Sequence, residues 1–406
     1  MGYRLVAGIL GVVLAACTLG QRATAPPDGA IAATKRAVDA ANQRALDNAR
    51  MSVDPKILAE TFAKRDCDGA PPPCMENPQK GATTIPRTGI PAPPDDGPTG
   101  ILRAEDNAIT LFDAKRFEDL DKLIGRYSTL QDRVDDGRFK LSGIGSFIAV
   151  IAENRRRQDS LKTVELWRTA NPNSPGAALL EAAVWRHAAW EARGNGYANS
   201  VLPEGWQLFH ARLEQASNSL AASEAYAGSN PLWYMQALDV KLELGASLDE
   251  QFALYYRAIK AFPEFFPLDF TMIRALLPKW GGSNEALAAF IESVVKRSPP
   301  ALKAQMYARL WWYVDQGNSL EVDVFRDMGA SWVRMRDGFE SLDRSYPDSV
   351  WIRSNFASFA CRAGDATSYI RLRAELGEKI NFYETRAFQS NASLEVCDAR
   401  AAGKPI

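Results

Sequence analysis

Hydrophobic residues recur at three- and four-residue spacing over most of the chain beyond Ile101. The spacing is clearest over residues 109–127, 179–190 and 252–262, and it places the apolar side chains on one face of a helix. Long alternating runs of β-branched residues bounded by turn pairs, which indicate strands, are absent from the sequence. The pattern therefore predicts an all-α fold.

Proline punctuates the predicted helices in a repeated way. Proline is tolerated in the first turn of a helix because that N–H has no intrahelical partner. The intervals from Pro231 to Pro263 and from Pro263 to Pro299 are 32 and 36 residues, close to the ~34-residue period of tetratricopeptide repeats. We expect a degenerate tetratricopeptide-like helix-pair solenoid, with an irregular helical bundle as the alternative.

The amino terminus has the pattern of a secretory signal. A charged start, Met1–Arg4, precedes an apolar run from Leu5 to Leu14 and the small residues Ala15 and Ala16. The run is too short to span a bilayer, which needs roughly 20 apolar residues. Residues 1–16 are therefore predicted to be a signal peptide, with later cleavage after Ala25 as an open alternative.

The last residues of this signal, Leu14-Ala15-Ala16-Cys17, resemble the lipobox of bacterial lipoproteins. The resemblance implies that the Cys17 thiol is acylated and becomes the new amino terminus, so the lipid holds the protein at a membrane. Several acyl chains together anchor firmly, whereas one binds only marginally. Thr18, and not aspartate, follows Cys17, and in a Gram-negative host this resemblance implies the periplasmic face of the outer membrane.

Composition shifts divide the remaining chain. Residues 17–33 are small and polar and are predicted to form a tether. Residues 34–69 are predicted to form a short helical segment, and the proline-rich residues 70–100 a linker that cannot continue a helix. A helical repeat domain follows over residues 101–298, and residues 299–406 are expected to extend the same solenoid.

The stretch from about Ile101 to Ser298 resembles an uncharacterised bacterial domain family with tetratricopeptide-like helices. The resemblance implies a helical fold and no particular activity. It rests on Phe117–Leu120 with Leu123, Arg133–Leu141 (RVDDGRFKL), Trp190–Tyr197 (WEARGNGY) and, as the most distinctive element, Leu277–Ser283 (LPKWGGS).

Lipid on Cys17 leaves four of the five cysteines, an even number that suits an oxidising compartment. Cys67 and Cys74 are neighbours within the proline-rich stretch, so a local pairing is economical. Cys361 would then pair with Cys397, although four cysteines allow three pairings. The spacings match no usual zinc ligand pattern, so we expect no metal site.

The sequence indicates neither a catalytic site nor a cofactor. A net charge of −1 without a basic stripe argues against nucleic acid as a partner. No GxSxG or phosphate-binding loop is present, and no carboxylate pair stands out. His187, one of two histidines, lies on an apolar helix face, which favours a place in the core. Gly194 and Gly281 are expected to reverse the chain at helix ends, and Ser283 to cap the next helix.

Aromatic residues give the remaining indication of function. Consecutive rings on one helix cannot all pack against one neighbour, so some are expected to line a groove, where solenoids hold their partners. The candidates are Phe265, Trp280, Trp312 and Tyr313. The leading hypothesis is a lipid-anchored envelope module that binds another envelope protein or peptide. The alternative is a protein that binds peptidoglycan or polysaccharide, or an envelope enzyme that acts on glycans.

Overall fold

The computed structural model describes Arg36 and residues 95–194, 198–317, 322–383, 387–388 and 392–403. The predicted signal peptide, the tether, Cys17, Cys67 and Cys74 lie outside these residues, as do nearly all of the predicted short helical segment and most of the linker. In the described part no helix is both long enough and apolar enough to cross a bilayer.

The described residues form fifteen α-helices and no β-strand apart from an isolated bridge between Arg133 and Phe139, so the all-α prediction is confirmed. The helices are α4 (Gly97–Asp113), α5 (Phe117–Ser128), α6 (Leu141–Asn154), α7 (Arg157–Ala170), α8 (Pro175–Arg193), α9 (Pro203–Ala227), α10 (Pro231–Glu243), α11 (Leu248–Ala261), α12 (Pro267–Leu276), α13 (Asn284–Arg297), α14 (Lys303–Gly317), α15 (Trp332–Ser345), α16 (Val350–Arg362), α17 (Ala366–Leu376) and α19 (Leu394–Ala401). Short 3₁₀ turns are η2 (Ala198–Ser200), η3 (Pro278–Trp280), η4 (Pro300–Leu302) and η5 (Gly377–Phe382).

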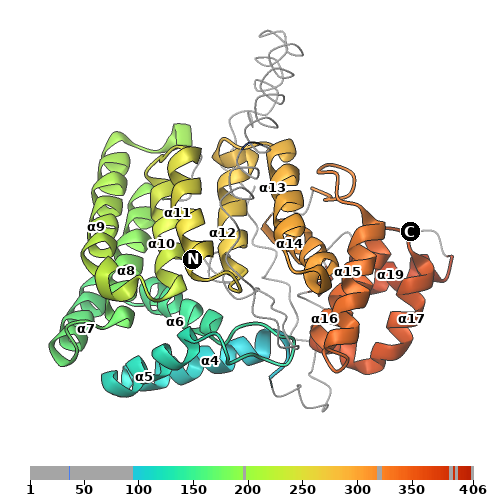
Figure 1. Ribbon diagram of the computed structural model, residues 1–406, viewed down its shortest axis with the longest axis horizontal. Helices are drawn as coiled ribbons and strands as arrows, with labels where there is room; N and C mark the ends of the chain where they lie inside the picture. The colour runs from blue at the N-terminus through green and yellow to red at the C-terminus, as the bar shows by residue number, and fades with distance from the viewer. Residues whose placement is uncertain are drawn as a thin grey trace, which may run out of the picture.

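Consecutive helices pack as neighbours, and every second helix from α4 to α14 also packs against the next but one. Figure 1 shows α8 to α14 as a row of upright helices, with α4 and α5 along the lower edge and α15 to α19 beyond the end of the row. The contacts run from α4 through α6, α8, α10, α12, α14, α15 and α16, and α16 touches α4 again. The packed helices therefore form a closed circuit.

Asp96 stands at the junction that closes this circuit. Its side chain, 1% exposed, accepts hydrogen bonds from Ser349 Oγ at 2.5 Å and from the Trp351 backbone N–H at 2.9 Å, at the start of α16. A carboxylate in that place satisfies helix-end donors and opposes the positive end of the helix dipole. Burial, with the nearby Asp136 carboxylate, raises the pKa of Asp96 to about 6.

The helix ends follow the chemistry of the local sequence. Ser174 caps α8 and Asn230 caps α10, each immediately before a proline in the first turn, as the punctuation predicts. Gly194 has φ 73° at the end of α8, so the expected chain reversal is confirmed. α4 begins at Gly97, three residues before the predicted end of the linker, because Pro98 fits a first turn and residues 96–98 are buried.

One hydrophobic core runs through both parts of the predicted solenoid. It includes Phe112 and Trp167 near the start and Phe339 and Phe356 near the end. Phe339 and Phe356 stack with ring centroids 5.3 Å apart. Helices on the two sides of residue 298 belong to the same core, since α13 packs on α14.

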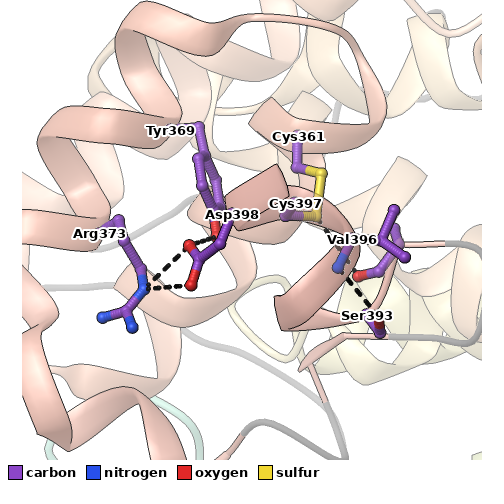
Figure 2. Close-up of a disulfide and its surroundings, with 8 residues drawn as sticks. Cys361, Tyr369, Arg373, Ser393, Val396, Cys397 and Asp398 are labelled. Carbon is purple, nitrogen blue, oxygen red and sulfur yellow. Dashed lines mark hydrogen bonds and ion pairs between the residues drawn. A yellow bond between two sulfur atoms is a disulfide. The ribbon is translucent and has the colours of Figure 1, made fainter. Parts of the chain in front are cut away.

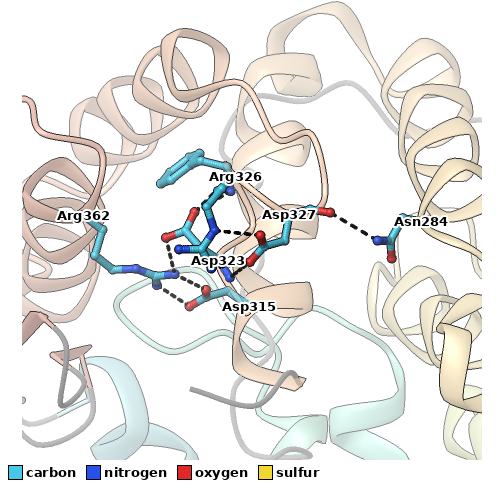
Figure 3. Close-up of polar contacts among 7 residues, drawn as sticks. Asn284, Asp315, Asp323, Arg326, Asp327 and Arg362 are labelled. Atoms are coloured by element: carbon cyan, nitrogen blue, oxygen red, sulfur yellow. Dashed lines mark hydrogen bonds and ion pairs between the residues drawn. The ribbon is translucent and has the colours of Figure 1, made fainter. Parts of the chain in front are cut away.

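Charged contacts fix the loop between α14 and α15. Arg362 on α16 donates to both carboxylate oxygens of Asp315 on α14, at 2.6 and 2.7 Å, and its guanidinium lies 3.7 Å from Asp323 in the loop (Figure 3). Asn284, the first residue of α13, donates to the backbone oxygen of Asp327 at 3.2 Å. The loop is therefore held from the α13 side and from the α16 side.

A disulfide joins Cys361 on α16 to Cys397 on α19, with the Cα atoms 5.6 Å apart. Both cysteines are buried. Beside the disulfide, Asp398 accepts hydrogen bonds from Tyr369 Oη at 2.6 Å and Arg373 Nε at 3.2 Å (Figure 2). The pairing predicted from the cysteine count is confirmed for these two residues.

Candidate functional site

Two adjoining cavities lie on the face that α6, α8, α10, α12 and α14 share. The first, of about 250 Å³, is lined by α6, α8, α10 and Arg274 of α12. The second, of about 480 Å³, is lined by α8, α9, α10, α12, η3 and α14. Arg186, Trp190, Met235, Asp239 and Arg274 line both. We call the two together the groove, the first cavity its α6 end and the second its α14 end.

Four charged side chains from three helices make the floor of the groove. Arg186 on α8 binds both oxygens of Glu243, at 2.6 and 2.8 Å, and lies 3.0 Å from Asp239. Arg274 on α12 donates to Asp239 and to Glu243, each at 2.7 Å. Each carboxylate on α10 is thus shared by two guanidinium groups, an arrangement that the planar fork of arginine favours.

Electrostatics keep Glu243 ionised. Burial raises the pKa of Glu243, but the charges of Arg186 and Arg274 outweigh burial and lower that pKa to about 2. The Glu243 side chain has no exposed surface, so its charge depends on these two partners. The network ties α8, α10 and α12 together beneath the groove.

Aromatic rings form the wall at the α14 end. Trp190, Trp206 and Trp280 are each partly exposed. The rings of Trp190 and Trp280 meet edge to face with centroids 6.3 Å apart. Arg193 lies over both Trp190 and Trp206, at 5.3 and 5.2 Å from the ring centroids, a distance at which cations interact with ring faces. The wall is both apolar and electropositive.

The LPKWGGS segment builds one side of this wall. Trp280 ends η3, and the Arg274 guanidinium lies 5.0 Å from its ring centroid. Gly281 follows with φ 87°, a left-handed conformation that glycine adopts without strain. A Cβ at Gly282 would overlap the carbonyl oxygen of Leu276. Ser283 then caps α13, as expected. The two glycines therefore serve a tight turn that places Lys279 and Trp280 on the groove.

The α6 end is apolar with a polar rim. Glu153, His187 and Glu191 line it together with alanines of α6 and α8. The sequence placed His187 in the core, and this prediction is wrong. Its side chain is 26% exposed, with Nε2 3.6 Å from Glu191 Oε1. The Oε1 atom of Gln236, on the wall of this cavity, is buried and accepts no hydrogen bond within the described residues.

Two of the four aromatic candidates from the sequence line the cavities. Trp280 and Tyr313 line the α14 end, where Tyr313 stacks on Phe270 at 4.8 Å. Trp312 and Phe265 are each 1% exposed and do not line the groove. Trp312 faces a different side of α14 and packs against Phe339 and Trp351.

Several residues of the groove were missed by sequence reasoning. Arg186, Asp239, Glu243 and Arg274 are ordinary charged positions in a helical pattern, which usually face solvent. Trp190 and Trp206 carried a weak signal as aromatic residues close to a glycine turn and to the start of α9. The signal that could have found the network is the presence of charges on otherwise apolar helix faces, such as Glu243 on α10.

Comparison with known protein families identifies part of the chain. Residues 107–234, from within α4 to the start of α10, match a family model described as a domain of unknown function (DUF4034). An uncharacterised domain in this part of the chain is therefore confirmed, while the LPKWGGS segment lies outside the matched residues. No curated protein and no solved structure matches the chain.

Proposed function

We propose that this protein is a lipid-anchored module of the cell envelope that holds a segment of another envelope protein or peptide in the groove. In this proposal the helix pairs are degenerate tetratricopeptide-like repeats, and Cys17 carries the lipid at the periplasmic face of the outer membrane. The alternation of contacts, in which consecutive helices pack together and every second helix from α4 to α14 also meets the next but one, supports the repeat assignment.

The observation that carries the proposal is the groove itself. Partly exposed tryptophan rings stand over a floor fixed by ion pairs, so little ordering entropy is lost when a partner binds. Rings of this kind supply large contact areas in protein interfaces. The unpaired oxygen of Gln236 offers an acceptor to a peptide N–H, and a buried acceptor without a donor is otherwise unfavourable.

The two carboxylates of the groove floor, Asp239 and Glu243, do not suit glycan cleavage. A glycosidase needs one carboxyl group that holds a proton near neutral pH and a second that is ionised. Asp239 and Glu243 are each held by two arginines, and the pKa of Glu243 is about 2. Binding of a glycan to the tryptophan rings is the second candidate function, because exposed rings also stack on sugars.

A photo-crosslinking amino acid at position 191 tests the choice between these functions. Glu191 lines the α6 end and its side chain is 59% exposed, so a crosslinker there should capture whatever occupies the groove in the native envelope. We expect a protein or peptide adduct, identified by mass spectrometry. Replacement of Trp280 by alanine should reduce this adduct about tenfold or more, the effect of removing an interface hot spot.

A crosslinker at Leu166 on α7 is the matched control, because its side chain is also exposed, at 49%, and it does not line the groove. The same adducts from both positions would contradict the proposal. Adducts that contain only glycan at position 191 would favour the second candidate function.

The anchor has its own test. Cys17→Ser should move the protein from the membrane fraction to the soluble fraction, because the hydroxyl of serine does not take the place of the acylated thiol. Immunoblotting of fractionated cells measures the change. Thr18→Ser is the control and should stay with the membrane. Retention of the Cys17→Ser protein in membranes would refute the lipid anchor.

A further inference from the structure

The two ends of the groove differ in charge. The α6 end adds Glu153 and Glu191 to the residues that both ends share, whereas the α14 end adds Arg193, Lys279 and Glu243. Glu243 is already held by Arg186 and Arg274. The α14 end therefore has an excess of positive charge, and the α6 end an excess of negative charge.

Lys279 is a cation at the α14 end that has no anionic partner among the described residues. Within the part of the chain that the structure describes, its ammonium group makes no hydrogen bond or ion pair, while the neighbouring Arg274 binds Asp239 and Glu243. Lys279 is an exposed residue, and partial desolvation and the charge of the neighbouring Arg274 lower the pKa of its ammonium group. An anionic group bound beside the ammonium would offset both effects.

The fold holds Lys279 in this place. It lies in η3 between α12 and the Gly281–Gly282 turn, next to Trp280, and close to the rings of the α14 end. An occupant that pairs with Lys279 therefore also meets the Trp280 ring. The charge and the apolar surface together define one kind of ligand, a carboxylate adjacent to a bulky apolar group.

We infer that the groove recognises an acidic peptide segment, with an Asp or Glu side chain or a terminal carboxylate paired to Lys279 and an adjacent apolar residue against the tryptophan wall. The inference rests on the proposed function. It adds the chemical character of the bound peptide and its orientation along the groove. The negative rim of Glu153 and Glu191 repels the acidic group from the α6 end, so the segment lies with its acidic residue at the α14 end.

Peptide display tests this inference. Random nonapeptides on phage are selected on the full chain held in detergent micelles, and the selected sequences are compared with the starting library. We expect Asp or Glu to be enriched next to an aromatic or aliphatic residue. Selection on Lys279→Glu should lose this enrichment and favour Lys and Arg instead. Lys260→Glu, at an exposed position of α11, is the control and should select the same acidic peptides as the unmodified chain.

Binding affinities measured by Trp fluorescence then test whether the acidic residue of the peptide contacts Lys279. For the best selected peptide, exchange of its acidic residue for the amide should weaken binding to the unmodified chain about tenfold, as for one charged hydrogen bond. The same exchange should change binding to Lys279→Gln less than about twofold.

The possible outcomes distinguish failure of the acidic-peptide inference from failure of the proposed peptide-binding function. Peptides selected without an acidic preference, or a preference that survives in Lys279→Gln, would overturn the inference and leave peptide binding intact. Selection of no peptide at all would contradict the proposed function as well.

Discussion

Replacement of Glu243 by glutamine is expected to lower the free energy of unfolding by about 3–5 kcal/mol, as for a buried ion pair that loses one partner. The amide leaves two guanidinium groups beneath the groove with Asp239 as their remaining carboxylate. Water solvates the uncompensated positive charge poorly, because the side chains of Arg186 and Arg274 are only 16% and 25% exposed. Urea unfolding followed by circular dichroism measures the loss.

Glu191→Gln is the matched control for this change. Its side chain is 59% exposed, so the loss should stay below about 0.5 kcal/mol, as for most surface substitutions. The double variant Arg186→Gln/Glu243→Gln should lose less than the sum of the two single changes, because the second removes a charge that the first left unpaired. Equal stabilities of Glu243→Gln and Glu191→Gln would show that the network contributes nothing.

The effect of Glu243 depends on pH in a defined direction. Its pKa in the folded protein is about 2, below the ordinary value of 4.5. The unfolded chain therefore takes up the proton first, and the stabilisation by Glu243 is complete above about pH 4.5 and declines as the pH falls from 4.5 towards 2. The difference in stability between the unmodified protein and Glu243→Gln should narrow over the same interval.

Removal of the Cys361–Cys397 disulfide is expected to lower stability by about 4 kcal/mol. The two residues are 36 positions apart in sequence, and for a loop of this length the restriction of the unfolded chain accounts for about that amount. The double variant Cys361→Ala/Cys397→Ala should show this loss in urea unfolding. Local contacts such as Tyr369 with Asp398 do not restrict the unfolded chain and cannot replace it.

Treatment with a reductant provides the control. Dithiothreitol in the urea solutions should lower the urea concentration at the unfolding midpoint of the unmodified protein. It should leave the midpoint of the double variant unchanged. Peptide mapping without reduction should find Cys361 and Cys397 in one linked peptide pair. Recovery of both cysteines as free thiols from the purified protein would contradict the prediction.

Local signals in the sequence predicted the helical fold well. The spacing of apolar residues identified an all-α chain, and the residues that start and end helices, such as Ser174 before Pro175 or Gly194 after α8, act through contacts a few positions away. The even number of cysteines left after Cys17 favoured a Cys361–Cys397 disulfide, although four cysteines allow three pairings. Each of these inferences depends on residues that are near in sequence or few in number, so one sequence contains the necessary information.

The groove could be predicted only in part, because its residues come together through tertiary packing. Arg186 and Glu243 are 57 positions apart, and neither differs in its sequence neighbourhood from a charge on a solvated face. Trp312 and Tyr313 are adjacent, yet successive residues on a helix point about 100° apart. One therefore packs against Trp351 and the other lines the groove, and no periodicity tells which neighbour covers which face.

A closed circuit of helices comes apart differently from an open row. In an open row each terminal unit has one neighbour, so loss of helices starts at the ends. Here α4 touches both α6 and α16, so the first helix of the circuit has a neighbour on each side. When the contact between two neighbouring helices of the circuit opens, the two helices stay connected through all the other contacts. Their effective concentration relative to each other remains high, which favours re-formation of the contact. A group of helices detaches only when two such contacts are open at the same time. Local unfolding is therefore slow, and proteases find few unfolded segments to cleave.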